Sequence, residues 1–115
     1  MEYFVGIDLG TSSVRAVAVD PDGNAAAAGQ CEYDIQKPEL DRAEQDMDQL
    51  WEATVQAIRK MLAEKPEIRD EVRGIGFSGQ MHGLVMVDRE IRPVGNAIIW
   101  ADQRSAEQIR HIYET

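Results

Sequence analysis

Two apolar runs separated by a short polar turn open the chain and constrain its fold more than any other feature. Residues 3–7 are rich in aromatic and β-branched residues, which favour strands, and residues 14–19 resume an apolar run. Between them, residues 8–13 are turn-forming, so the spacing predicts a β-hairpin with a polar tip. We expect the first strand to be buried on both faces, because its aromatic and β-branched residues form one short run.

A second turn follows at residues 20–24, where Pro21 fixes one backbone angle and Gly23 permits a positive φ. It leads into residues 25–33, whose small side chains are compatible with a third strand. The first third of the chain therefore predicts three consecutive antiparallel strands.

An amphipathic helix is expected after the loop that contains Pro38. Asp46 can cap its first turn, Gln49 can complete a variant of the capping box, and Pro66 stops it. Apolar residues then recur at helical spacing, and we assign this stripe to the core without a further function. Its members are Leu50, Trp51, Thr54, Val55, Ile58, Met61 and Leu62.

The second half of the chain predicts more strands and a final helix. The pattern predicts strands at residues 72–77, 84–87 and 97–100. A polar loop at 78–83 and a turn at 88–90 would connect them. Residues 101–115 read as a helix with Asp102 as its cap. The fold class is therefore α/β, with three antiparallel strands, a helix and further strands in one mixed sheet of a single domain.

Composition excludes several classes of partner and site. The chain has 115 residues, with 12 Lys and Arg against 21 Asp and Glu, and a net charge of −9 that disfavours nucleic acid and anionic membranes. Cys31 is the only cysteine, so it cannot form an intrachain disulfide, and His82 and His111 do not complete a zinc motif. Without a basic leader or a long apolar run, we expect a cytoplasmic protein.

The polar tip of the first hairpin carries the groups that would bind phosphate. Its backbone N–H groups and hydroxyls can converge on an anion, while Asp8 could hold Mg²⁺ and Arg15 could position the phosphates. The alternative is a plain hairpin connection, and neither Gly-x-Gly-x-x-Gly nor a Walker A motif is present. The candidate phosphate- and nucleotide-binding residues are Asp8, Gly10, Thr11, Ser12, Ser13 and Arg15.

The order of these features resembles the opening of the actin-like, ribonuclease-H-like ATPase superfamily, with Gly-Ile-Asp-Leu-Gly-Thr-Ser at residues 6–12 similar to its first phosphate motif. A narrower resemblance is to the FGGY carbohydrate kinases. Its further segments are residues 43–46 leading to Trp51, Gly-Gln-Met-His-Gly at 79–83 and Ile-Trp-Ala-Asp-Gln-Arg at 99–104. Gln-Met-His-Gly is most typical of the members that act on xylulose.

The resemblance implies an ATP- and Mg²⁺-dependent kinase that converts D-xylulose to D-xylulose 5-phosphate. Met81 and His82 would contact the sugar, and the segment that follows Trp100 would lie near the same cleft. A lone histidine is more often structural, but here the flanking glycines and the resemblance favour a ligand. The candidate substrate-binding residues are Gln80, Met81, His82, Asp102, Gln103 and Arg104.

Other readings of these residues stay open. Asp102 could be only a helix cap and Arg104 only a solvated charge. Ser13 and Arg15 stand where other members often have Gly and Lys, which conserves hydrogen bonding or charge. Ala101 stands where many relatives acting on xylulose have a polar residue, which weakens the assignment of the sugar.

The resemblance also implies that residues 1–115 are a truncated N-terminal sugar-binding half-domain. The second, ATP-binding domain would be absent, with the catalytic base and adenine pocket after residue 115, so the fragment alone should be inactive. Its exposed apolar face then predicts self-association. The alternatives are a kinase for gluconate, ribulose, fuculose or glycerol, a non-catalytic actin-like nucleotide-binding or assembly module, and a structural remnant; Met81 and His82 argue against glycerol.

Overall fold

The computed structural model describes all residues, 1–115, and the chain divides into two compact units. Unit 1 comprises residues 1–33 and 48–80, and unit 2 comprises residues 34–47 and 81–115. The chain therefore passes between the units at three places, and each unit is described by itself.

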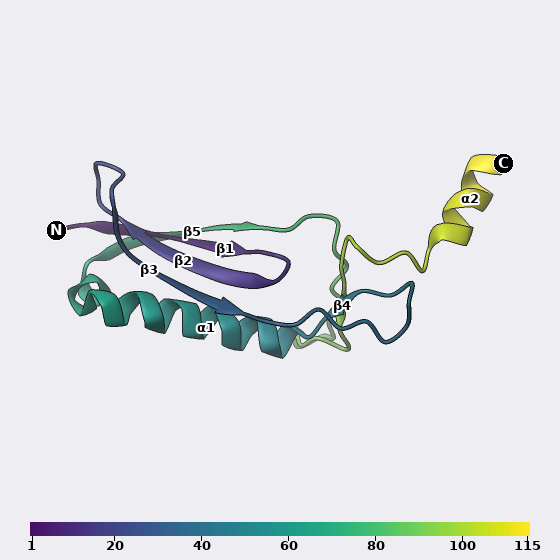
Figure 1. Ribbon diagram of the computed structural model, residues 1–115, viewed down its shortest axis with the longest axis horizontal. Coiled ribbons are helices and arrows are strands. Elements are labelled where there is room, and N and C mark those ends of the chain that lie inside the picture. Colours follow the sequence, from purple (N-terminus) through teal and green to yellow (C-terminus); the bar gives the residue numbers. More distant parts are fainter. The chain divides into compact units, whose positions relative to one another are not determined.

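Unit 1 is built on a four-stranded sheet in the order β3-β2-β1-β5 (Figure 1). The strands are β1 (Tyr3–Leu9), β2 (Ser13–Val19), β3 (Ala25–Glu32) and β5 (Val72–Gly79). β1 pairs antiparallel with β2 and parallel with β5, and β2 pairs antiparallel with β3. The prediction of three antiparallel strands within a mixed sheet is confirmed.

The second turn forms as its residue types require. Asp20 Oδ1 accepts hydrogen bonds from the N–H groups of Asp22 and Asn24, at 3.0 and 2.9 Å. Gly23 has φ +85°, a left-handed conformation that costs glycine little. The turn thereby sets the register of the β2–β3 hairpin.

The helix α1 (Met47–Glu64) covers one face of this sheet (Figure 1). Burial alternates along β1, so the expectation that this strand is buried on both faces is wrong: Val5 is 5% exposed, whereas Phe4 is 44% exposed on the other face. The core lies between the sheet and the helix. Its buried members are Tyr3, Val5, Ile7, Val14, Ala16, Ala18, Ala27, Tyr33, Ala53, Ala57, Met61 and Ile68.

Glycine permits α1 to approach β3 closely. A Cβ atom on Gly29 would lie 2.1 Å from the carbonyl oxygen of Ala57 and 2.6 Å from the amide nitrogen of Met61. The helix ends at Glu64, before the 3₁₀ helix η1 (Pro66–Asp70), as Pro66 predicts. Trp51 is 68% exposed, so its assignment to the core is wrong. The buried residues of the helix are Thr54 and Met61, which belong to the predicted stripe, and Ala53 and Ala57, which do not.

Unit 2 contains little regular structure. Its two-stranded sheet pairs β4 (Glu44–Gln45) with β6 (Ala97–Ile98), and α2 (Ala106–Glu114) follows. The predicted strand at 84–87 is wrong, because only isolated bridges form there, between Leu84 and Ile98 and between Val87 and Pro93. The strand predicted at 97–100 is confirmed in part, as the two residues of β6. The predicted helix start is also wrong, since α2 begins after Ser105 and Asp102 does not cap it.

None of the helices combines the length and apolarity needed to cross a bilayer.

Candidate functional site

A hollow of about 400 Å³ lies on the sheet of unit 1. Gly6 of β1 and Gly76 of β5 are direct partners in the sheet, and no atom lies within 4 Å of where their Cβ atoms would be. The register places these glycines on the face of the sheet away from the buried Val5 and Ile7. The hollow is lined by Gly6, Ile7, Asp8, Arg15, Val17, Gly76, Phe77 and Ser78.

Three polar side chains meet at one end of this hollow. Asp8 is paired with Arg15 across the β1–β2 hairpin and with Ser78 across the β1–β5 pair. All three side chains therefore share a face of the sheet, and all three residues are exposed. A carboxylate, a guanidinium and a hydroxyl beside a glycine floor can receive a polar, phosphate-bearing molecule.

The turn between β1 and β2 is fixed from within and by Tyr33. The Gly10 N–H donates to the Ser13 carbonyl at 2.9 Å, so this N–H is used inside the turn. The Tyr33 N–H donates to the Ser12 carbonyl at 3.0 Å, and the Tyr33 hydroxyl donates to the Gly10 carbonyl. Residues 10–13 are thereby held in one conformation at the end of the sheet.

Gln80 is brought to the same turn. Its N–H donates to the Leu9 carbonyl at 3.1 Å, and its Oε1 accepts a long hydrogen bond of 3.5 Å from Thr11 Oγ1. A residue predicted to bind sugar thus lies directly against one predicted to bind phosphate, because β5 runs parallel to β1 and ends beside the hairpin.

The described chain contains no group of three or more His, Cys, Asp and Glu side chains that could hold a metal ion. Asp8 is a single exposed carboxylate beside the glycine floor. Mg²⁺ is commonly held by one or two carboxylates together with waters and substrate phosphates. Asp8 therefore fits a metal ion that arrives with a phosphate-bearing ligand, and does not fit an all-protein metal cage.

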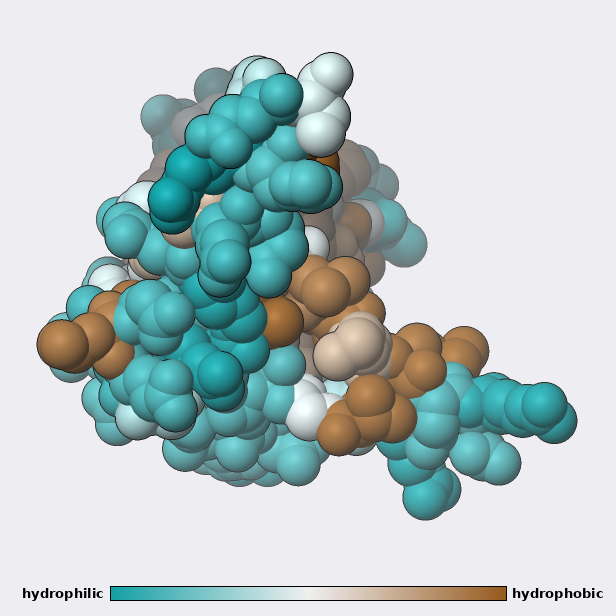
Figure 2. Space-filling model, turned by 90° about the vertical axis from the view of Figure 1, so that its right-hand side faces the viewer, coloured by the Kyte–Doolittle hydropathy of each residue, from teal (hydrophilic) through white to brown (hydrophobic).

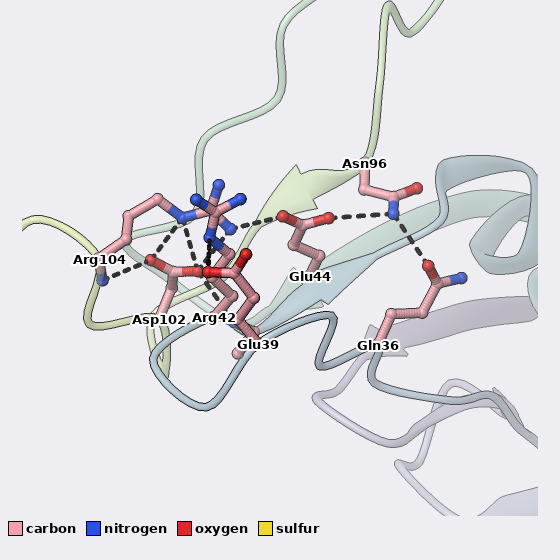
Figure 3. Close-up of polar contacts among 8 residues, drawn as sticks. Gln36, Glu39, Arg42, Glu44, Asn96, Asp102 and Arg104 are labelled. Atoms are coloured by element: carbon pink, nitrogen blue, oxygen red, sulfur yellow. Dashed lines mark hydrogen bonds and ion pairs between the residues drawn. The ribbon is translucent and has the colours of Figure 1, made fainter.

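In unit 2, Arg104 lies between two carboxylates (Figure 3). Its Nε donates to both oxygens of Asp102 at 2.9 Å, and its Nη2 donates to Asp102 Oδ2 at 2.7 Å and to Glu44 Oε2 at 2.5 Å. The hydrogen bonds from Arg104 hold the pKa of Asp102 and that of Glu44 below their ordinary values. The same contacts, first of all that with Asp102, raise the pKa of Arg104.

The network extends through Glu44 of β4 to Asn96, the residue before β6 (Figure 3). Asn96 Nδ2 donates to Gln36 Oε1 at 2.9 Å and to Glu44 Oε1 at 3.2 Å. Asp102 Oδ2 also accepts the Ala43 N–H at 2.9 Å. We call Glu44, Asn96, Asp102 and Arg104 the charged network of unit 2.

This network decides the open alternatives for Asp102 and Arg104. The Asp102 side chain is 4% exposed and the Arg104 side chain 27%, so Arg104 is not a solvated charge. The Gln103 N–H is engaged with the Asp41 carbonyl at 2.8 Å, while its residue is exposed. Sequence reasoning missed Glu44 and Asn96, although Glu44 belongs to the first of the resembling segments.

Met81 and His82 lie in unit 2, in an exposed turn. Met81 is 71% exposed, and His82 has φ +65°, a left-handed conformation that is uncommon outside glycine. Two hydrogen bonds between Leu84 and Ile98, of 2.8 and 3.0 Å, hold the chain just after this turn. The expectation that Asp8 and His82 face a common cavity stays a prediction, because they belong to different units.

The sheet of unit 1 has three antiparallel strands, a parallel fourth strand and a covering helix, and this arrangement is the actin-like ATPase fold. A family model described as "FGGY family of carbohydrate kinases, N-terminal domain" matches residues 3–115. The chain belongs to this family, as the motifs at residues 6–12, 79–83 and 99–104 predict.

Individual relatives agree with this assignment. A xylulose kinase from Staphylococcus epidermidis is 40% identical over 112 residues, which cover 96% of this chain and 22% of that protein. A crystal structure of a "xyloylose kinase" from Brucella ovis matches with a TM-score of 0.93 and 36% identity, over 96% of this chain and 23% of that chain. A gluconate kinase from Lactobacillus acidophilus matches with a TM-score of 0.88 and 25% identity, over 98% and 22%. The chain spans less than a quarter of each relative.

Proposed function

We propose that this chain is the N-terminal part of an ATP-dependent sugar kinase that phosphorylates D-xylulose to D-xylulose 5-phosphate. The observation that carries the proposal is the likeness to xylulose kinases, which reaches 40% identity and, for a structure, a TM-score of 0.93 over nearly the whole chain. The motif Gln-Met-His-Gly at residues 80–83 supports the same substrate.

In this proposal the phosphates of ATP lie over the glycine floor of unit 1. The turn residues Thr11, Ser12 and Ser13 offer hydroxyl and N–H donors, and Arg15 attracts the phosphate oxygens. Asp8 holds the Mg²⁺ ion that accompanies ATP. That ion, when bound, offsets the charge of the phosphate oxygens during transfer.

The sugar would contact the turn that contains Met81 and His82. His82 would hydrogen-bond a sugar hydroxyl, while Met81 would cover an apolar part of the ring or chain. Gln80, already beside Thr11, would contact the end of the sugar nearest the phosphates. Because Asp102 and Arg104 are occupied with each other, we assign them to support of this region, and Gln103 to its rim.

The remaining parts of the enzyme would lie in a longer polypeptide. Phosphoryl transfer to a hydroxyl needs a group that accepts its proton, and we assign that base and the adenine pocket to a second, C-terminal domain. This assignment is supported by the share of the relatives that the chain covers. The 115 residues alone are then expected to show no turnover. The reducing cytoplasm suits the single Cys31 and supplies ATP.

The test is a coupled ADP-release assay on the complete protein encoded by the source gene. D-xylulose, D-ribulose, L-fuculose, D-gluconate and glycerol are compared as acceptors, and we expect the highest kcat/KM for D-xylulose. Asp8→Asn should abolish most of this activity, while the exposed Asp70→Asn should leave it unchanged. Release of ADP without dependence on any sugar, as in an actin-like assembly module, would contradict the proposal.

Gluconate is the second candidate acceptor. The Lactobacillus acidophilus gluconate kinase has nearly the same fold over this region, with a TM-score of 0.88. A kcat/KM for gluconate above that for D-xylulose would favour this reading, and would leave the kinase assignment intact.

A further inference from the structure

The guanidinium of Arg104 connects two segments of unit 2 that are far apart in sequence. It contacts Glu44 from β4 on one side and Asp102 on the other, and both carboxylate side chains are largely buried, at 16% and 4% exposure. Hydrogen bonds between ionised partners are short and strongly directional. Arg104 therefore fixes the position of β4 relative to the segment that follows β6.

A continuous path leads from Arg104 to the turn that contains His82. Glu44 is paired with Ile98 in the two-stranded sheet. Ile98 in turn exchanges two hydrogen bonds with Leu84, at 2.8 and 3.0 Å. Leu84 is two residues after His82, so displacement of β4 or β6 would be passed to this turn through backbone contacts alone.

The His82 backbone needs such support. A non-glycine residue with φ near +65° is less stable than one in the ordinary backbone regions, and this conformation persists where its surroundings impose it. Met81 and the other residues of the turn are exposed and bury little that could impose it. The hydrogen-bonded pair of Leu84 and Ile98 supplies a constraint next to the turn.

We propose that Arg104 is a positioning residue for sugar binding: by joining Glu44 to Asp102 it holds the β4–β6 pair, and through Ile98 and Leu84 it sets the conformation of the turn at Met81 and His82. This inference rests on the proposed function, in which that turn binds the sugar. Arg104 does not contact the sugar in this role, because its guanidinium is engaged by the two carboxylates.

The test compares Arg104→Gln and Arg104→Lys with the wild type in the complete protein. Lysine keeps the charge but cannot reproduce the forked contacts with two carboxylates. We expect KM for the sugar to rise about tenfold in Arg104→Gln, and KM for ATP to change by less than about twofold, since the misplaced turn contacts the sugar only. KM for the sugar in Arg104→Lys should lie between the values for the wild type and Arg104→Gln. Arg73→Gln, which breaks the exposed pair with Glu2, is the matched control and should behave as the wild type.

A purely structural role would lower kcat through loss of folded enzyme and leave KM for the sugar unchanged, and this result would overturn the inference. Glu44→Gln, which keeps the side-chain shape and weakens the contact with Arg104, should raise the same KM and serves if Arg104→Gln does not fold. Hydrogen exchange of the Leu84 and Ile98 amides gives a second readout, with faster exchange expected in Arg104→Gln and unchanged rates counting against the inference. If the wild type phosphorylates no sugar, the proposed function fails, and the exchange rates still decide whether Arg104 holds the turn.

Discussion

The hydroxyl of Tyr33 donates a hydrogen bond to the carbonyl oxygen of Gly10, and so connects the end of β3 to the turn between β1 and β2. Tyr33 is 9% exposed, and its N–H also donates to Ser12. Tyr33→Phe keeps the ring and the backbone contact but leaves the Gly10 carbonyl without this donor. We expect a loss of about 1 kcal/mol in the free energy of unfolding, measured by urea denaturation.

The same variant tests the proposed phosphate site. A looser turn should raise KM for ATP in the complete protein, while KM for the sugar changes less. Tyr113→Phe is the matched control, because Tyr113 is 86% exposed. Equal stability of Tyr33→Phe and the wild type would show that the hydroxyl contributes nothing to the turn.

Gly29 of β3 lies directly against the backbone of α1. Gly29→Ala would place a methyl group 2.1 Å from the Ala57 carbonyl oxygen, so β3 or α1 would have to move. We expect the free energy of unfolding to fall by about 1–3 kcal/mol, as for other overpacked cores. Gly95→Ala, where the added carbon meets no atom within 4 Å, is the control in the same denaturation experiment. A stable Gly29→Ala would mean that α1 lies farther from β3.

A substitution at Gly76 should weaken ligand binding without lowering the stability of the fold. Gly76→Val adds a β-branched side chain to a strand, and its Cβ meets no atom within 4 Å. The fold should therefore be retained, with a thermal midpoint close to that of the wild type. The added side chain would fill part of the hollow, so binding of Mg-ATP by the complete protein, measured by calorimetry, should weaken at least about tenfold. Wild-type affinity in Gly76→Val would move the nucleotide site elsewhere.

The charged network predicts how stability depends on pH. The pKa values of Asp102 and Glu44 are lowered in the folded protein, so the unfolded chain binds more protons as acid is added. Their stabilising contribution is complete above the ordinary pKa of a carboxyl group, about 4, and is lost as the pH falls below it. Urea midpoints measured from neutral pH downward should decline more steeply for the wild type than for Asp102→Asn. Parallel curves would show that Asp102 is not paired in the folded protein.

Exposed apolar side chains predict self-association of the 115-residue chain. β5 is an edge strand, and Ile75 and Phe77 on it are 55% and 69% exposed. Apolar side chains also gather at the surface in the view of Figure 2. Sedimentation velocity should therefore reveal species larger than a monomer, and Ile75→Lys should reduce them, because a charge on an edge strand opposes pairing. Leu40→Lys, at a fully exposed position, is the control, and a monomeric wild type at all concentrations would refute the prediction.

The elements of unit 1 were predictable from sequence because their signals are local. The hairpin, the turn at Asp20 and the end of α1 before Pro66 follow from residue types within a few positions. Burial was less predictable, since it depends on which face of the sheet receives the helix. Trp51 continues the apolar period of α1 and is exposed, because small residues such as Ala53 and Ala57 form the contact with the sheet.

Unit 2 was poorly predicted because distant segments hold it together. Asp102 reads as a helix cap in isolation, but its carboxylate binds the Ala43 N–H and Arg104. No local period could reveal that Glu44 and Arg104, sixty positions apart, form an ion pair. Glu44 and Arg104 belong to two of the segments that resemble the FGGY kinases, residues 43–46 and 99–104. Their ion pair explains why the two segments are found in the same sequence.

The floor of the hollow over Gly6 and Gly76 is bare main chain. At these two positions no side chain can rotate, titrate or oxidise, so such changes affect only the walls of the hollow and not this part of its floor. A related sequence with glycine at the positions of both Gly6 and Gly76 can accordingly keep this floor. A larger residue at either position would make the hollow shallower there.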